Sequence, residues 1–135
     1  MRIKALSLSN GYAAPWASWI REGRKTIETR MWGTGYRGPV LICASKRPNG
    51  PMAGCAVCIV DLLGCRWMRR SDEALALCDW ELGRFAWVLA NVRHVLPFHV
   101  RGRLGLFGVD VPDELVRAAP SVPTAFPLLD LGGGS

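Results

Sequence analysis

The amino-acid sequence predicts an α+β fold, a small mixed β-barrel of about six strands with two to three helices at its side. Its 135 residues suffice for one hydrophobic core but not comfortably for two. Hydrophobic residues make up 50% of the chain, which is typical of a globular protein. The strand-like segments do not alternate strictly with helical ones, and this order disfavours a doubly wound sheet.

The first three elements follow from local patterns near the N-terminus. Residues 3–9 alternate between apolar and polar side chains, as a half-buried strand does. Pro15 fits the first turn of a short helix, and Gly23 is a suitable helix stop. Residues 25–32 are compatible with a second strand, in which Thr26, Glu28 and Arg30 would share one face.

The remaining elements are expected in the second half of the chain. Residues 40–45 predict a short buried strand, and residues 55–68 a long central strand with a bulge at Gly64. Ser71 followed by two acids predicts the N-terminus of a helix over 71–83. Two further strands and a short helix are expected over 84–95, 102–111 and 112–119. We predict one domain of residues 1–118 and a Pro/Gly-rich C-terminal tail of residues 119–135.

The net charge of +6 and the pI of about 9.5 point to an anionic partner. Most of the cations are arginine, whose planar fork binds phosphate bidentately and stacks on bases. Nucleic acid is the leading partner on this ground. The other interpretation is that the charge only keeps a small protein soluble.

The cysteines are interpreted as free thiols. There are five, and an odd number without an export signal favours a reducing compartment. Cys55 and Cys58 resemble a metal or redox motif, but alternation along a strand would direct them to opposite faces. We therefore expect no metal and no cofactor. No apolar run reaches the roughly 18 residues of a membrane span and no signal peptide is recognised, so the cytosol is the expected location.

The segment "GRKTIETR", residues 23–30, carries the main candidate for chemistry. A carboxylate at Glu28 can accept a proton from water, and an ammonium at Lys25 can stabilise the resulting oxyanion. In an ideal strand, residues 25 and 28 would lie on opposite faces of the sheet. Lys25, however, follows the turn at Gly23, so the alternation of a strand does not fix its direction. The alternative is a set of surface ion pairs on an edge strand.

Other candidates would bind the substrate around this pair. Aromatic side chains are expected to stack on a base, and cations and hydroxyls to contact a phosphate or carboxylate. The candidates are Trp16, Thr26, Arg30, Trp32, Tyr36, Arg37, Ser45 and Lys46. Arg101 and Arg103 are either phosphate ligands or solvated charges. His94 and His99 have no partner visible in the sequence and are interpreted as structural.

Several motifs in order resemble one known family. The run G-x-K-x-x-E-x-R is followed by "YRGP" and by an apolar strand that ends in "AS". "FAWVLANVRHV" and "VRGRLGLFGVD" come later in the same order. Over about residues 3–112 the chain resembles the ASCH domain family, which implies a PUA-like barrel. One difference is the segment "NGYAAPWA", about four residues longer than usual, so that either Tyr12 or Trp16 takes the place of the family's aromatic residue.

The resemblance also implies a function. Family members are thought to bind RNA or nucleotides in a basic cleft beside the first helix. One branch consists of amidohydrolases that remove acyl groups from N4-acylcytidine, with a lysine that matches Lys25 and a nucleophilic threonine that matches Glu28. A second, distant glutamate assists in that branch. The chain thus retains the lysine and has a glutamate in place of the threonine.

Two functions follow from these observations. The first is hydrolysis of a modified nucleoside, namely removal of the acyl group of N4-acylcytidine-type substrates in a basic cleft by Lys25 and Glu28. The alternative is a non-catalytic module that binds RNA or single-stranded nucleic acid. Metal-dependent RNA cleavage is a weaker third, because no tight carboxylate cluster is evident. The expected partner is a modified nucleoside or RNA, and neither a membrane nor an obligate protein partner is indicated.

Overall fold

The computed structural model of the protein describes residues 1–117, so the tail expected over 119–135 lies outside the described residues. The chain forms strands and helices in the order β1 (Arg2–Leu8), α1 (Trp16–Arg21), β2 (Ile27–Arg30), β3 (Gly38–Ala44), β4 (Cys55–Trp67), α2 (Glu73–Ala76), β5 (Phe85–His99), β6 (Phe107–Asp110) and α3 (Asp113–Arg117). A 3-10 turn, Arg70–Asp72, leads into α2.

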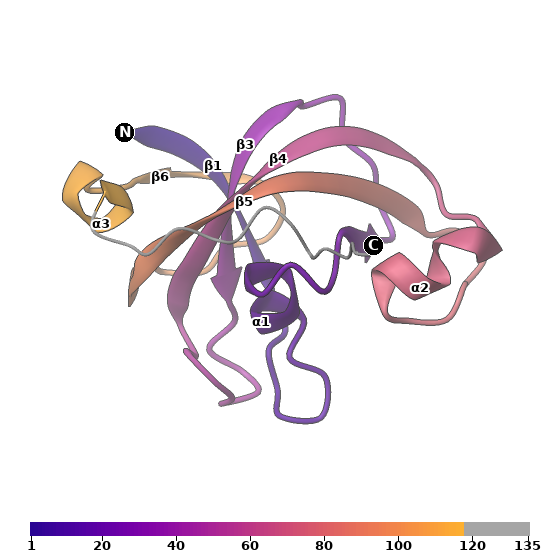
Figure 1. The fold of residues 1–135 in the computed structure, drawn as a ribbon, viewed down its shortest axis with the longest axis horizontal. Helices are drawn as coiled ribbons and strands as arrows, with labels where there is room; N and C mark the ends of the chain where they lie inside the picture. Colours follow the sequence, from indigo (N-terminus) through magenta and orange to yellow (C-terminus); the bar gives the residue numbers. More distant parts are fainter. Residues whose placement is uncertain (118–135) are drawn as a thin grey trace, which may run out of the picture.

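The six strands form one curled, mixed sheet in the order β2-β5-β4-β3-β1-β6. β1 and β3 are parallel, whereas the other neighbouring strands are antiparallel. Figure 1 shows the long strands β4 and β5 arching side by side, with α2 at one end of the arch and α3 at the other. The α+β class and the PUA-like arrangement are thus confirmed. The expected barrel is not strictly closed, because β2 and β6 lie at opposite edges of the sheet.

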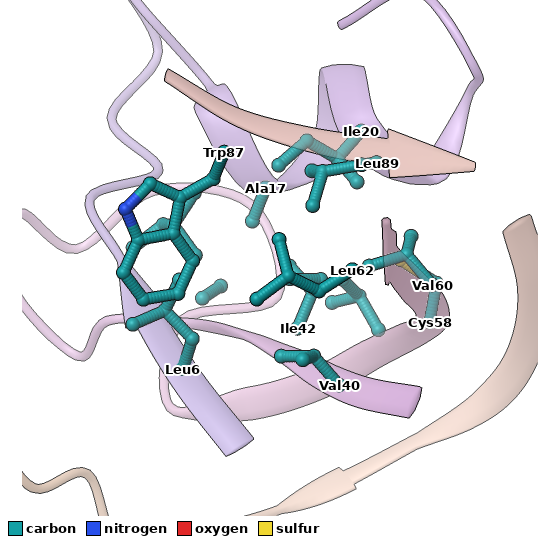
Figure 2. Packing of buried hydrophobic residues seen from close by; sticks show 13 residues of the cluster. Leu6, Ala17, Ile20, Val40, Ile42, Cys58, Val60, Leu62, Trp87 and Leu89 are labelled. Atoms are coloured by element: carbon teal, nitrogen blue, oxygen red, sulfur yellow. The ribbon is translucent and has the colours of Figure 1, made fainter. Parts of the chain in front are cut away.

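The largest cluster of core residues lies between the sheet and α1. Figure 2 shows Trp87 of β5 and Leu62 of β4 facing Ala17 and Ile20 of α1. Trp87 is fully buried, while Trp19 and Trp80 are only partly buried. This packing fixes the position of α1 over the sheet. The site described below is built by α1, β2 and the segment that follows β1.

The prediction of one helix over residues 71–83 is wrong. Only a 3-10 turn and one helical turn form, and the helix ends at Leu77, whose φ of 56° is left-handed. Ser71 is not the N-cap, because Asp72 accepts hydrogen bonds from the Arg69 amide and from both Nη atoms of Arg66. These bonds tie the segment to the end of β4 rather than letting a longer helix propagate.

The long strand β4 has the expected bulge near Gly64. Its register against β5 shifts between Leu62 and Gly64, and also at two earlier points. Cys58 is fully buried, whereas Cys55 is half-buried with its Sγ 3.9 Å from Nδ1 of His99. All five cysteines are free.

Metal-binding clusters and membrane spans can be assessed for residues 1–117. In this range no group of three or more histidine, cysteine, aspartate or glutamate side chains is arranged to hold a metal ion. Nor does any helix in it have the length and apolarity needed to cross a bilayer.

Candidate active site

A small inner pocket of about 250 Å³ lies where α1, β2 and the segment after α2 meet. Its volume is below the roughly 300 to 1,000 Å³ of pockets for drug-sized ligands, so it suits a fragment such as one nucleobase. Both members of the predicted pair, Lys25 and Glu28, line it. The complete lining is Ser9, Trp16, Lys25, Glu28, Thr29, Arg30, Cys78 and Arg84.

Lys25 reaches this pocket because it lies in the turn between α1 and β2. The helix ends before Gly23, whose φ of 79° is left-handed, and the Lys25 amide donates to the Trp19 carbonyl at 3.0 Å. β2 begins only at Ile27, so Lys25 is not subject to the strand's alternation. Its Nζ therefore lies 3.6 Å from Oε1 of Glu28, and the predicted convergence of the two side chains is present.

The Lys25 side chain is almost completely enclosed, with a relative exposure of 1%. Its Nζ donates a hydrogen bond to the Ala76 carbonyl at the end of α2 and lies 4.6 Å from the centroid of the Trp16 ring. A surface ion pair on an edge strand would be solvated and would contribute little. The burial of Lys25 therefore argues against that alternative.

Glu28 is held between two cations. It lies on β2 opposite Trp87 of β5, and only 8% of its side chain is exposed. Its Oε2 accepts a hydrogen bond from Nη1 of Arg30 at 3.1 Å, while Oε1 faces Lys25. Opposite charges around a buried carboxylate compensate for its desolvation.

Burial also changes the acidity of Lys25. Loss of solvation lowers the pKa of Lys25 below its ordinary value, and the nearby Glu28 carboxylate opposes this shift without cancelling it. An ammonium with a lowered pKa is a stronger acid than a lysine in water. Lys25 is thus suited to donate a hydrogen bond, or a proton, to an oxygen that gains negative charge.

A second, larger cavity of about 890 Å³ lies next to the inner pocket and is called the outer cavity below. Ser9 and Arg30 line both, so the two cavities adjoin each other. Four of its lining residues are cationic, none is acidic, and the complete lining is Ser7, Ser9, Arg30, Ala44, Ser45, Lys46, Ala53, Gly54, His99, Val100, Arg101, Gly102, Arg103 and Leu104.

The outer cavity follows from the topology. Because β1 and β3 are parallel, their carboxyl ends lie at the same edge of the sheet, which places Ser7 and Ser9 beside Ser45 and Lys46. The segment after β5 passes over this edge at Gly102, where an added Cβ would lie 3.1 Å from Oγ of Ser7. The absence of a side chain there allows the close approach that brings the flanking arginines to the cavity.

The structure brings together most of the candidate residues. Trp16 and Arg30 line the inner pocket with Lys25 and Glu28, and Ser45 and Lys46 line the outer cavity. Tyr12 is 79% exposed, so Trp16 is the aromatic residue beside the lysine. Arg101 and Arg103, for which two interpretations were open, both face the outer cavity.

Four candidates lie outside both cavities. Thr26 is held by its backbone between Leu75 and Leu89, and Trp32 packs edge-on against Trp87. The other two belong to the loop before β3. There Tyr36 donates its hydroxyl to the Pro39 carbonyl, and Arg37 donates to the carbonyls of Thr34 and Tyr36.

Sequence reasoning missed several lining residues. Thr29 and Cys78 face each other in the inner pocket, with 3.8 Å between Oγ1 and Sγ, although they are far apart in the chain. His99, interpreted as structural, lines the outer cavity, whereas His94 does contact the Arg21 carbonyl. The position of Ser7 and Ser9 at the end of the first strand was the one available signal for the outer cavity. It points to the cavity only when the pairing of β1 with β3 is known.

Comparison with known proteins gives a consistent result. The profile of the ASCH domain matches residues 11–99. The fold is similar to a crystal structure of ASCH from Zymomonas mobilis, with a TM-score of 0.63, 16% identity, and coverage of 89% of this chain and 97% of that one. Two mutant forms of the Zymomonas mobilis protein give TM-scores of 0.57 at 14% identity over 79% of this chain, and cover 89% and 87% of theirs. A search of curated proteins finds no match.

Proposed function

The chain belongs to the ASCH domain family, and from this premise we propose that it is a cytosolic amidohydrolase that acts on a modified nucleoside. The substrate class is an N4-acylated cytosine derivative, and the products are the cytosine derivative and a carboxylic acid. The observation that carries this proposal is the buried pair of Lys25 and Glu28, 3.6 Å apart in a pocket lined by Trp16.

The proposed reaction uses both members of the pair. Glu28 accepts a proton from a water molecule as the water oxygen bonds to the acyl carbon. Lys25 stabilises the oxyanion that forms on the acyl oxygen. The bond between the acyl carbon and N4 then breaks, and the N4 amine leaves with the proton that Glu28 had taken. No covalent intermediate is required, which suits a chain with glutamate where the family's acylcytidine branch has a nucleophilic threonine.

Glu28 needs one free oxygen to act as a base. Its two partners differ in how freely their side chains can move. Lys25 is enclosed, whereas the side chain of Arg30 is 26% exposed and faces the outer cavity. Arg30 is therefore the partner that can withdraw when substrate arrives. Its withdrawal would leave Lys25 and Glu28 facing the acyl group.

Trp16 is suited to hold the base. Its ring contacts the Lys25 ammonium and lines the inner pocket. Stacking on an aromatic side chain is worth about 1–3 kcal/mol per base. A cytosine stacked on Trp16 would bring its exocyclic N4 substituent next to Lys25.

The test is direct. Purified protein is incubated with N4-acetylcytidine, and release of cytidine is followed by chromatography for the wild type, Glu28→Gln and the control Glu22→Gln. Glu22 is an exposed carboxylate at the end of α1 that pairs with Arg24, so its loss removes the same charge outside the site. The proposal expects cytidine release by the wild type and the control only. No release by the wild type from any N4-acylcytosine would overturn it.

The outer cavity favours a second function, a non-catalytic module for RNA or single-stranded nucleic acid. Four cations and no carboxylate line it, which is the arrangement expected around a phosphate backbone. Under this alternative the protein would bind oligonucleotides with or without acylated cytosine equally well and would release no cytidine.

A further inference from the structure

We propose that the inner pocket also binds small oxo acids covalently, as an imine between the Lys25 amine and the carbonyl carbon of the ligand. Such a ligand carries an aldehyde or ketone group next to a carboxylate. The inference goes beyond the proposed function and does not depend on it. It needs only a reactive amine, a group that carries protons and a group that binds the carboxylate, and all three line the inner pocket.

Lys25 has the surroundings of a nucleophilic lysine. It lines the inner pocket, and only 1% of its side chain is exposed. Loss of solvation is the main cause that lowers the pKa of Lys25 below its ordinary value of 10.5, which favours the neutral amine. Lysines desolvated in this way form imines with carbonyl compounds in enzymes. A neutral amine keeps N–H groups, so the hydrogen bond to the Ala76 carbonyl survives deprotonation.

Glu28 can carry the protons that imine formation needs. Its Oε1 lies 3.6 Å from Nζ of Lys25 and can take one proton from the ammonium. The neutral nitrogen then bonds to the carbonyl carbon, and Glu28 passes its proton to the carbonyl oxygen. Glu28 next removes a second proton from the nitrogen and returns it to the hydroxyl, which leaves as water when the C–O bond breaks. The products are a protonated imine and one water molecule, and no oxidant or reductant is consumed.

The reaction also preserves the buried charges. A protonated imine carries the same positive charge as the Lys25 ammonium, and Glu28 is a carboxylate again when the water has left. Both members of the buried ion pair therefore remain charged. Removing one partner of such a pair is strongly destabilising, and the adduct avoids that cost.

Arg84 selects a carboxylate on the ligand. It lines the inner pocket from the segment before β5 and has no part in the proposed hydrolysis. Its partner is Glu81 at 2.6 Å, whose side chain is 61% exposed, so exchange of this carboxylate for one on a ligand costs little. Guanidinium groups bind carboxylates bidentately. The volume of about 250 Å³ leaves room for a short oxo acid beside Lys25.

Reductive trapping tests the imine directly. The purified protein is incubated at neutral pH with glyoxylate and sodium cyanoborohydride, which reduces an imine to a stable secondary amine, and the labelled lysines are identified by peptide mass spectrometry. The chain has three lysines, and the exposed Lys4 and Lys46 are internal references. Lys46 is the stricter one, because it lies beside the arginines of the outer cavity.

Preferential labelling of Lys25 is the expected result. Acid–base assistance by a positioned side chain contributes about 10²- to 10⁴-fold, so Lys25 should be labelled at least about ten-fold faster than either reference. The preference should disappear in guanidinium chloride, because unfolding removes the pocket. Labelling of Lys25 no faster than that of Lys4 and Lys46, or a preference that persists in the unfolded chain, would overturn the inference.

Two aldehydes locate the carboxylate. Acetaldehyde has a methyl group where glyoxylate has its carboxylate, and the ratio of labelling at Lys25 to that at Lys4 cancels their different intrinsic reactivity. This ratio should be at least about ten-fold higher for glyoxylate, as one charge-assisted hydrogen bond predicts, and Arg84→Ala should remove the difference. Arg24→Ala is the matched control, because Arg24 also pairs with an exposed glutamate but lines neither cavity. A difference that persists in Arg84→Ala would overturn the assignment of the carboxylate to this residue.

Trapping and hydrolysis are separate readouts. Rapid trapping at Lys25 without cytidine release from N4-acetylcytidine would support this inference and overturn the proposed function. Cytidine release without preferential trapping would overturn this inference and leave the hydrolase intact. If both occur, glyoxylate should inhibit cytidine release competitively, because the two ligands share the inner pocket. Inhibition of another kind, or none, would contradict a shared pocket.

Discussion

The inner pocket and the outer cavity are neighbours and share two lining residues, but their charges are arranged differently. In the inner pocket, Lys25 and Glu28 are buried and charges of opposite sign face each other. In the outer cavity, the cations Lys46, Arg101 and Arg103 are open to solvent and face no carboxylate among the described residues. Arg30 belongs to both.

Under the proposed function, this difference assigns the chemistry to the inner pocket and ligand binding to the outer cavity. Enclosed opposite charges act strongly at short range, which suits proton transfer and oxyanion stabilisation. Exposed like charges act over a longer range and are screened by salt, which suits capture of an anionic ligand. Changes in the first region should therefore affect kcat, and changes in the second should affect affinity and its salt dependence.

The largest effect is expected from the inner pair. Lys25→Ala removes the proposed oxyanion donor and should lower kcat about 10²- to 10³-fold. Glu28→Gln removes the proposed base and should lower kcat about 10²- to 10⁴-fold. Since the two act as a unit, the double variant should lose much less than the product of the single losses. Kinetics on N4-acetylcytidine measures all three.

A buried partner left alone is destabilising, so each variant needs a folding control. Thermal unfolding followed by circular dichroism shows whether the variant is folded at the assay temperature, and Lys25→Met preserves most of the side-chain volume. Activity that survives in folded forms of all these variants would mean that the chemistry lies elsewhere.

A smaller effect is expected when salt weakens binding at the outer cavity. Four phosphate contacts to a single strand predict a slope of about −3 in log affinity against log salt, or roughly a 50-fold loss between about 50 and 200 mM salt. Fluorescence anisotropy with a labelled oligonucleotide measures the slope. An affinity independent of salt would leave the net charge of +6 with a role in solubility only.

The segment that supports the inner pocket offers a stability test. The Arg66 guanidinium lowers the pKa of Asp72 to about 2, with a further contribution from the Arg69 amide. Relative to an unfolded value of 3.8, this shift corresponds to about 2 kcal/mol of stability. At pH 7, the Asp72→Asn variant should lose most of this stabilisation, which is measured as the free energy of unfolding in urea.

The sign of the pH dependence follows from the direction of that shift. A lowered carboxyl pKa stabilises the fold above the unfolded value of 3.8, and the stabilisation disappears as the pH falls through the folded value of about 2. The wild type and Asp72→Asn should therefore converge in stability at acid pH. A difference that is independent of pH would show that the Asp72 charge is not its source.

The smallest effect is expected from the aromatic wall. Trp16→Leu should raise KM for N4-acetylcytidine at least about five-fold through lost stacking. Tyr12→Leu is the control, because Tyr12 is 79% exposed and lines neither cavity. Equal effects of the two substitutions on KM would show that Trp16 does not hold the base.

The sequence was most informative where a local rule decides the structure. Gly23 ends α1, and because Lys25 lies in the following turn its convergence with Glu28 was predictable without knowledge of the fold. The bulge at Gly64 was also predictable, because a glycine inside a strand is itself a local signal of a bulge. The helix over 71–83 was not, because Arg66, outside the segment, captures Asp72 and holds the chain in a shorter turn.

The outer cavity could not be predicted in full, because it is assembled from distant segments. Ser7 and Ser45 become neighbours only through the parallel pairing of β1 with β3, and Arg101 reaches them only because Gly102 packs on Ser7. Conversely, Tyr36 lies close in sequence to β2, but its loop turns away and lines a different pocket with Met1 and Pro39. Proximity in the chain is a poor guide wherever a turn of unknown direction intervenes.

Under the proposed function, a cytosine ring lies beside Lys25 and Glu28 in the inner pocket, and any phosphate attached to its sugar lies near the arginines of the outer cavity. A crystal structure of the Glu28→Gln variant with N4-acetylcytidine 5′-monophosphate tests it most directly. We expect the acyl oxygen about 3 Å from Nζ of Lys25, with the phosphate against Arg101 and Arg103. A cytosine ring bound outside the inner pocket, or an acyl group directed away from Lys25, would contradict the account.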